Sequence, residues 1–234
     1  MGVAAPPPTR YMCPHVVHSF ETMNRTRRFT DRTDAGERLG SELRERGIDA
    51  DIALAIPRGG LPLGRAVADS LDVPLDIVVA KKIGAPGNPE YAVGAVASDG
   101  SVWRNERAID GTQTDEEYFQ DQRETEAANA RQKADRYRGG RSKPDLTDKT
   151  VVVVDDGVAT GSTARACLER VKNSDAERIV LAVPVGPPDT IAELEETVDD
   201  VVCLEIPAGF RGVGQFYENF GQVSDEEAMA YLET

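Results

Sequence analysis

Short apolar runs alternate with segments of helical periodicity along most of this chain. In the first half, the apolar runs at 52–56 and 75–80 predict buried strands. The residues from Thr33 onward and those at 61–71 have apolar positions at helical spacing and predict helices. Strand and helix therefore alternate with short connections, as in a parallel sheet that is covered by helices.

The same alternation resumes in the second half of the chain. Strands are predicted at 151–154, 178–183 and 201–204, and helices at 161–171 and 189–198. Five short apolar strands interleaved with helices predict an α/β fold with an open, mostly parallel sheet.

Two segments depart from this alternation. Residues 1–23 are rich in proline and predict a loose tail, so that Met23 is an alternative start of the protein. A charged helix is predicted at 115–138, within an insertion at 105–142. This helix is expected to be solvated and flanked by mobile segments, and both a lid and a surface insertion without function are open interpretations. Residues 24–234 are expected to form a single domain.

The charge balance narrows the possible partners. The 234 residues include 41 Asp and Glu against 27 Lys and Arg, which gives a net charge of −14 and a pI near 4.6. Such a surface disfavours binding to duplex nucleic acid, which relies on basic residues that release counterions. The basic residues are six lysines and 21 arginines, and an acidic, lysine-poor surface is typical of proteins that work in concentrated salt. A salt-loving host is expected, with an ordinary acidic enzyme as the alternative.

Histidine and cysteine usage argues against several catalytic chemistries. The two histidines, His15 and His18, lie in the tail, which makes a nucleophile activated by a histidine base improbable. Cys13, Cys167 and Cys203 are far apart and lack the spacing of a zinc site or a disulfide framework. No apolar run approaches the roughly 20 residues of a membrane span, and the N-terminus does not resemble a signal peptide. A cytoplasmic location without a membrane partner is expected.

The most informative segment reads VVVVDDGVATGST at 151–163. A buried strand delivers Asp155 and Asp156 at its carboxyl end, and residues 159–163 form a loop of small residues that opens a helix. Free N–H groups at a helix N-terminus, together with three hydroxyls, favour the binding of a phosphate group. The two carboxylates instead prefer neutral hydroxyls or a metal ion. A ribose 5-phosphate would satisfy both preferences.

This segment resembles the phosphoribosyl pyrophosphate (PRPP) motif of the type I phosphoribosyltransferases, in which four apolar residues precede two acids and a short T-G-x-[ST] loop. The order of elements from about residue 33 to 220 is consistent with that family, so the resemblance covers most of the chain. The resemblance implies that Asp155 and Asp156 bind the ribose hydroxyls, directly or through Mg²⁺. It also implies that the PRPP 5-phosphate lies against the residues of the loop that follows, namely Gly157, Ala159, Thr160, Gly161, Ser162 and Thr163.

The resemblance also implies a loop that binds pyrophosphate after the first strand of the sheet. The segment AIPRGG at 55–60 is similar to it, since Gly59 and Gly60 permit a close approach of the backbone and Arg58 supplies charge. In relatives this loop often holds a cis peptide bond, which here would join Pro57 to Arg58. An ordinary turn between a strand and a helix is the alternative.

Further charged groups follow the second predicted strand. Lys81 and Lys82 are expected to bind pyrophosphate, and Lys82 with Arg58 to stabilise charge during the reaction, although a solvated lysine pair is the alternative. The segment at 84–96 resembles the flexible catalytic loop of the family, and within it Glu90 is the candidate general acid or base.

The resemblance says least about the acceptor of the reaction. The small hood that covers the base in this family is expected at 184–188 and 205–220, with Phe210 stacked on the base. Hypoxanthine and guanine enzymes carry an acid where this sequence has Ala159, which argues against straightforward 6-oxopurine chemistry.

The resemblance as a whole implies a Mg²⁺-dependent phosphoribosyltransferase. Such an enzyme moves ribose 5-phosphate from PRPP to a nitrogenous acceptor, with a nucleobase expected here, and releases pyrophosphate. The alternative is a regulatory module that senses PRPP or a nucleotide without catalysis. A homodimer is also implied by the family, and the sequence itself identifies neither the acceptor nor the interface.

Overall fold

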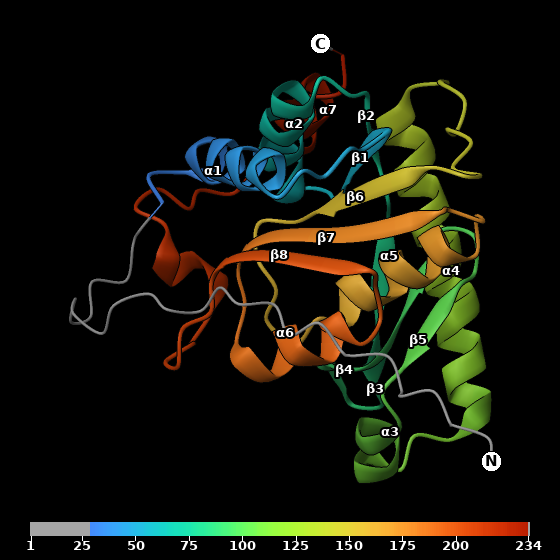
Figure 1. The fold of residues 1–234 in the computed structure, drawn as a ribbon. Coiled ribbons are helices and arrows are strands. Elements are labelled where there is room, and N and C mark those ends of the chain that lie inside the picture. Colours follow the sequence, from blue (N-terminus) through green and yellow to red (C-terminus); the bar gives the residue numbers. More distant parts are fainter. Residues whose placement is uncertain (1–28, 234) are drawn as a thin grey trace, which may run out of the picture.

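A five-stranded parallel sheet forms the centre of the protein in a computed structural model, which describes residues 29–233 (Figure 1). The spatial order of the strands is β2-β1-β6-β7-β8, so the order along the sheet reverses between β1 and β6. Ligands of open α/β sheets bind at the carboxyl ends of the strands where such a reversal occurs. The strands are β1 (Ile52–Ala55), β2 (Leu75–Ile77), β6 (Thr150–Val154), β7 (Arg178–Val185) and β8 (Asp200–Glu205).

Helices cover both faces of this sheet, as the sequence predicted. Helices α1 (Arg32–Glu45) and α2 (Gly60–Leu71) pack on one face, and α5 (Ser162–Lys172) and α6 (Pro188–Glu195) pack on the other. The central strand β6 is buried on both faces because successive side chains point to opposite sides of a strand. Val152 therefore contacts the α1 and α2 layer. The open, mostly parallel α/β fold is confirmed.

A second, antiparallel sheet was not predicted from the sequence. It consists of β3 (Ala80–Ala85), β4 (Asn88–Ala97) and β5 (Val102–Arg104), in that order. The segment at 84–96, expected to be a flexible loop, instead forms most of the β3–β4 hairpin. That expectation was wrong because Gly and Pro residues around the turn interrupt the alternation that marks a strand.

The charged helix is confirmed as α4 (Glu116–Arg138), after a short helix α3 (Glu106–Thr112). The expectation of a solvated helix was wrong, because one face of α4 is buried against β3 and β4 and against the edge of the parallel sheet. Alanines supply half of the buried positions, and their weak hydrophobicity hides the helical periodicity in a charged sequence. The buried residues of α4 are Phe119, Ala127, Ala130, Ala134, Tyr137 and Arg138.

The C-terminal part of the chain returns to the carboxyl edge of the sheet. After a short 3₁₀ helix η1 (Val213–Phe216), the chain ends in α7 (Asp225–Ala230), which lies close to α2 in Figure 1. Ser224 caps α7 and forms a capping box with Glu227. At the other end, the backbone N–H of Phe29 donates to the carbonyl of Phe216 at 2.7 Å, so the start of the described chain is held against η1.

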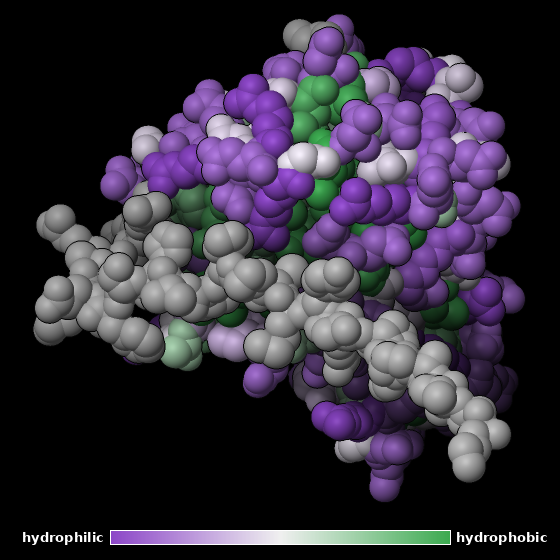
Figure 2. Space-filling view, viewed as in Figure 1, coloured by the Kyte–Doolittle hydropathy of each residue, from purple (hydrophilic) through white to green (hydrophobic). Residues whose placement is uncertain are grey.

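The face of the protein shown in Figure 2 is mostly polar, with hydrophilic residues over most of its described surface. Within residues 29–233, the helices are all too short or too polar to cross a membrane. The tail predicted at 1–23, with both histidines, lies outside the described residues.

Candidate functional site

The two acids of the sequence motif lie beside the glycines of the first loop. Strands β1 and β6 are paired in register, with Ala55 opposite Val154, so the loops that follow them are neighbours. A Cβ atom added to Gly59 would lie 2.0 Å from an oxygen of the Asp156 carboxylate. A Cβ atom on Gly60 would lie 2.8 Å from the carbonyl oxygen of Val154. The close approach of the two backbones therefore requires glycine at position 60, and a side chain at position 59 would displace the Asp156 carboxylate.

The loop after β6 surrounds a small cavity at the N-terminus of α5. The cavity has a volume of about 170 Å³. Gly161 precedes α5 in the left-handed region, with φ of 72°, and no side chain caps the helix. The first N–H groups of α5 are thus free for an anion, and the helix dipole favours one there. Every residue predicted to hold the 5-phosphate lines this cavity, as does Val213 from η1; the predicted set is Gly157, Ala159, Thr160, Gly161, Ser162 and Thr163.

Helix α6 supports the outer part of this loop. The Thr190 hydroxyl donates a hydrogen bond of 2.8 Å to the carbonyl oxygen of Ala159. Arg165 of α5 forms an ion pair of 2.6 Å with Glu193 of α6. These contacts hold the loop at 159–163 and helix α5 against α6. The residues that line the cavity are therefore restrained in position.

Burial strongly affects the two acidic side chains. The pKa of Asp155 is raised well above its usual range, first because burial disfavours its charged form and second because Asp156 lies nearby. Burial also raises the pKa of Asp156, and this effect is partly offset by an arginine. Asp155 lines the cavity. Two partly buried carboxylates in contact are costly unless a cation or hydroxyl donors accompany them.

That arginine is Arg32, a site residue that the sequence did not reveal. Its Nε lies 2.8 Å from the Asp156 carboxylate, and its guanidinium also donates to the carbonyl of Gly221 at 2.7 Å. The guanidinium stacks on the ring of Phe220, 3.9 Å from the centroid. Tyr217 donates to the Asp156 carbonyl at 2.7 Å. Asp156 is therefore tied to the N-terminal end of α1 and to the C-terminal segment, whereas Asp155 faces the cavity.

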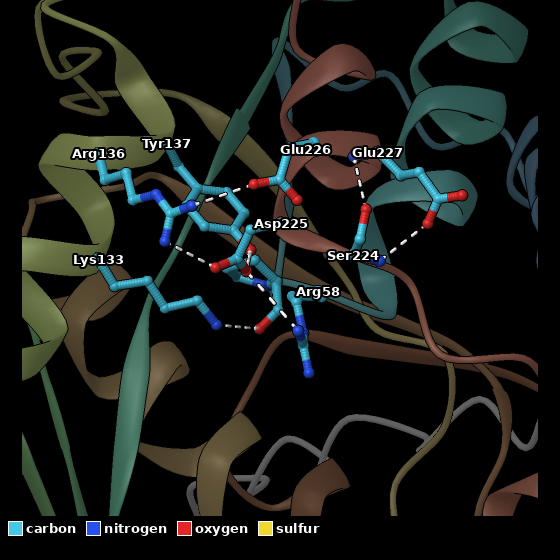
Figure 3. Close-up of polar contacts among 9 residues, drawn as sticks. Arg58, Lys133, Arg136, Tyr137, Ser224, Asp225, Glu226 and Glu227 are labelled. Atoms are coloured by element: carbon cyan, nitrogen blue, oxygen red, sulfur yellow. Dashed lines mark hydrogen bonds and ion pairs between the residues drawn. The ribbon is translucent and has the colours of Figure 1, made fainter.

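The predicted pyrophosphate loop is joined by a lysine from α4 (Figure 3). The peptide bond between Pro57 and Arg58 is cis, as expected. Lys133 donates from Nζ to the carbonyl of Pro57 at 3.0 Å. Lys82 lines the cavity, and Lys81 is close enough to Lys133 to lower the pKa of the latter.

Two predicted residues are placed away from the cavity. The ring of Phe210 stacks on Phe216, with 5.7 Å between the centroids, and packs against the core under α1 and α2. Glu90 is exposed at the start of β4 and does not line the cavity. In the first predicted hood segment, residues 184 and 185 belong to β7. The base-binding role of Phe210 and the acid–base role of Glu90 stay predictions.

Comparison with known proteins agrees with this geometry. A family model described as the phosphoribosyl transferase domain matches residues 30–217. The chain belongs to this family. The match covers the strands β1 and β6, their loops and the helices around them, so the phosphoribosyl transferase domain extends over nearly all of the described chain.

Individual similar proteins and a solved structure show over what length, and how strongly, this phosphoribosyl transferase domain resembles known proteins. A Mycobacterium tuberculosis protein, whose name assigns it provisionally to the phosphoribosyl transferases, is 42% identical over 205 residues, which are 88% of this chain and 46% of the relative. The chain thus spans about half the length of the curated relatives it matches. A uracil phosphoribosyltransferase of Clostridioides difficile is 39% identical over 57 residues, or 24% of this chain and 27% of the relative. The crystal structure of TT1426 from Thermus thermophilus has a TM-score of 0.76 and 39% identity, and the match covers 88% of this chain and 97% of that one.

Proposed function

We propose that this protein transfers ribose 5-phosphate from PRPP to a nitrogenous acceptor and releases pyrophosphate. The observation that carries the proposal is the meeting of two loops where the strand order reverses. One loop provides a helix N-terminus for a phosphate and a carboxylate for hydroxyls, and the other provides Arg58 and two closely fitted glycines. PRPP carries a phosphate, a diol and a pyrophosphate in that order, which corresponds to this arrangement.

The residues then have distinct roles in binding. The N–H groups at the start of α5 and the hydroxyls of Thr160 and Thr163 hold the 5-phosphate. Asp155 accepts hydrogen bonds from the ribose hydroxyls, and Asp156 keeps the neighbouring backbone in place through Arg32. Arg58, Lys81 and Lys82 bind the pyrophosphate.

The reaction is a displacement at the anomeric carbon. The bond from this carbon to the pyrophosphate oxygen breaks, the acceptor nitrogen forms the new bond, and the acceptor proton is lost to a base or to water. The transition state carries positive charge on the ribose and growing negative charge on the pyrophosphate. Residues that hold both ends of PRPP therefore contribute mainly by positioning and by stabilising charge.

We propose Mg²⁺ as the cofactor. The carboxylates present fit an ion that is held partly by the protein and partly by substrate oxygens and water. No cluster of three or more Asp, Glu, His or Cys side chains suited to a metal ion occurs among residues 29–233. Mg²⁺ in phosphate-binding enzymes is commonly held by one or two carboxylates together with substrate oxygens and water. Asp155, with Asp156 beside it, would hold the ion in that way. When bound, the ion would neutralise part of the pyrophosphate charge.

A nucleobase is the acceptor that we propose. The short similarity to a uracil phosphoribosyltransferase supports this class of acceptor without fixing the base. We further propose a cytoplasmic homodimer adapted to high salt. The free thiols of Cys167 and Cys203 fit a reducing compartment.

The second candidate function is a module that binds PRPP or a nucleotide without catalysis. It is favoured by one observation, namely that the predicted base-binding and acid–base residues, Phe210 and Glu90, lie outside the cavity. Assays of pyrophosphate release with Mg²⁺, PRPP and a panel of purine and pyrimidine bases distinguish the two. Release that depends on one base and is lost in Asp155→Asn supports the transferase. Tight PRPP binding without release for any base supports the sensing module.

A further inference from the structure

Helix α4 presents a basic face to the proposed pyrophosphate loop (Figure 3). Lys133 reaches from this helix to the carbonyl of Pro57, at a distance of 3.0 Å. One turn further along, Tyr137 donates to Asp225 of α7, and Arg136 forms an ion pair of 2.9 Å with the same carboxylate. The Asp225 carboxylate is also 3.9 Å from Arg58. The loop at 55–60, helix α4 and helix α7 are therefore joined around the Asp225 carboxylate.

The lysines in this region lack carboxylate partners. Within the part of the chain that the structure describes, Lys81, Lys82 and Lys133 form no ion pair, although the protein carries a net charge of −14. Lys81 and Arg58 lie close enough to Lys133 to lower its pKa, and Lys82, next to Lys81 on β3, lines the cavity at α5.

Lys143 and Lys149 also form no ion pair among the described residues, so this property alone does not mark a ligand site. What distinguishes Lys81 and Lys133 is that they lie close to each other and to Arg58, beside the proposed pyrophosphate loop. Cations held together in this way favour an anionic ligand.

The surroundings of Lys133 are unfavourable for its charge. Burial is the largest cause that lowers its pKa, and Lys81 and Arg58 lower it further, while Asp225 acts in the opposite direction. The Lys133 stem packs beside Tyr137, whose ring centroid is 5.4 Å from Nζ. One N–H of the ammonium group is used by Pro57, and two remain. The cost of keeping this charge is relieved when an anion binds.

We propose that Lys133 binds the pyrophosphate group of PRPP, so that helix α4 forms part of the substrate site. This inference rests on the proposed function and deepens it. Pro57 orients the ammonium group, and the remaining N–H groups donate to phosphate oxygens beside Arg58. Lys133 therefore recognises the pyrophosphate end of the ligand, whereas the cavity at α5 recognises the 5-phosphate end.

Ligand selectivity tests this role. We would titrate PRPP, pyrophosphate and ribose 5-phosphate into wild type and Lys133→Gln by calorimetry, at constant ionic strength. Loss of a charged donor predicts a Kd for PRPP and for pyrophosphate that is roughly tenfold higher or more. The affinity for ribose 5-phosphate is expected to stay unchanged. Lys133→Arg should retain most of the affinity for pyrophosphate.

The matched control is Lys143→Gln, since burial and nearby arginines lower the pKa of Lys143 as well but the residue lies beyond α4. It should leave all three affinities unchanged. Lys133→Met keeps an apolar stem next to Tyr137 and serves if the Gln variant unfolds. The inference is overturned if an uncharged, folded variant binds PRPP like wild type, or loses ribose 5-phosphate to the same extent. If wild type binds neither PRPP nor pyrophosphate, the proposed function itself fails.

The pH dependence of the wild type supplies a readout that a purely structural role would not move. The charged and titratable groups around Lys133 are Lys81 of β3, Arg58 of the loop, Asp155 after β6, Cys167 of α5 and Asp225 of α7. Only the protonated amine binds an anion, so the lowered pKa predicts that pyrophosphate affinity falls as pH rises from neutrality toward 10.5, the ordinary value. Arginine stays charged over this range. The affinity of Lys133→Arg relative to wild type should therefore rise with pH, and a constant ratio would contradict the proposal.

Discussion

Asp155 and Asp156 are neighbours in the chain and have different surroundings. Asp155 lines the cavity, whereas the Asp156 carboxylate is paired with Arg32 at 2.8 Å, with 12% and 16% of the Arg32 and Asp156 side chains exposed. Two adjacent acids in a motif suggest equal roles. The structure instead places one acid at the cavity and the other in the connection between the motif loop and α1.

This difference predicts the effect of Asp155→Asn on the free protein. Burial and Asp156 raise the pKa of the Asp155 carboxyl group, which means that its charged form destabilises the folded protein. Because the substitution removes this charge, the free energy of unfolding should rise by about 1 kcal/mol in a buffer with a chelator. PRPP binding should be lost at the same time. Thermal unfolding and calorimetric titration of the same sample measure both effects.

Asp156→Asn is the comparison for that prediction. It also relieves repulsion with Asp155, but it deprives Arg32 of its ion-pair partner, so its gain in stability should be smaller. A lower unfolding temperature for Asp155→Asn than for wild type would contradict the account of this pair.

The close fit of the two loops is tested at Gly59. A Cβ atom in Gly59→Ala would lie 2.0 Å from the Asp156 carboxylate, so either this carboxylate must turn away from Arg32 or the loops must separate. Destabilisation by about 1–3 kcal/mol and a clear loss of PRPP affinity are expected, because overpacking costs this much. Gly111→Ala is the control, since a Cβ atom there would meet nothing within 4 Å. Equal stability of the two variants would show that the loops are not closely fitted.

At the scale of elements, α6 supports the phosphate loop from outside. In Thr190→Val, the carbonyl of Ala159 loses a hydrogen bond of 2.8 Å. One such bond is worth about 1 kcal/mol, so the affinity for PRPP and for ribose 5-phosphate should fall about fivefold. Thr197→Val provides the control, because its hydroxyl bonds only to the end of its own helix, at the carbonyl of Leu194. If both variants bind like wild type, α6 does not support the loop.

The elements also show how far the sequence predicts this fold. The strands of the parallel sheet and the phosphate loop were predictable, because each is encoded by a contiguous segment with its own pattern. The second sheet was missed where Gly and Pro surround the turn of the hairpin. The buried face of α4 was missed because half of its buried positions are alanines, which are only weakly hydrophobic.

The site residues that were missed share another property. Arg32 lies 124 positions from Asp156, and Lys133 lies 76 positions from Pro57. Neither residue belongs to a local motif, and only the packing of α1 and α4 brings them to the carboxyl edge of the sheet. Such contacts depend on tertiary structure, which a single sequence does not display.

The whole molecule combines an acidic exterior with a basic group of side chains at one edge. Its net charge of −14 disfavours the compact state by self-repulsion, whereas Lys81 and Arg58 lie near Lys133 and Lys82 lines the cavity at the proposed site. The proposed function therefore requires that anions be bound locally, in an overall field that repels them. Salt screens the self-repulsion of the folded protein and also the attraction between the basic group and an anion. Stability should therefore rise with salt, whereas the affinity for an anionic ligand should fall.

The expected response to salt follows from this charge. Raising KCl from about 0.1 M to about 2 M shortens the Debye length from about 10 Å to a few ångströms, so the unfolding temperature should rise by several degrees at pH 7. Near pH 4.6, the sequence pI, there is little net charge to screen, and the effect should largely disappear. An equal rise at both pH values would show that self-repulsion is not the cause.

The central claim is that the edge formed by β1 and β6 binds PRPP. It is tested most directly by calorimetric titration of PRPP with Mg²⁺ into the wild-type protein in molar KCl. The account predicts one PRPP molecule bound per chain, displaced by pyrophosphate and by ribose 5-phosphate. Absence of binding by a protein whose thermal unfolding shows it to be folded would contradict the account, and the cavity at α5 would then have to be assigned to another phosphorylated ligand.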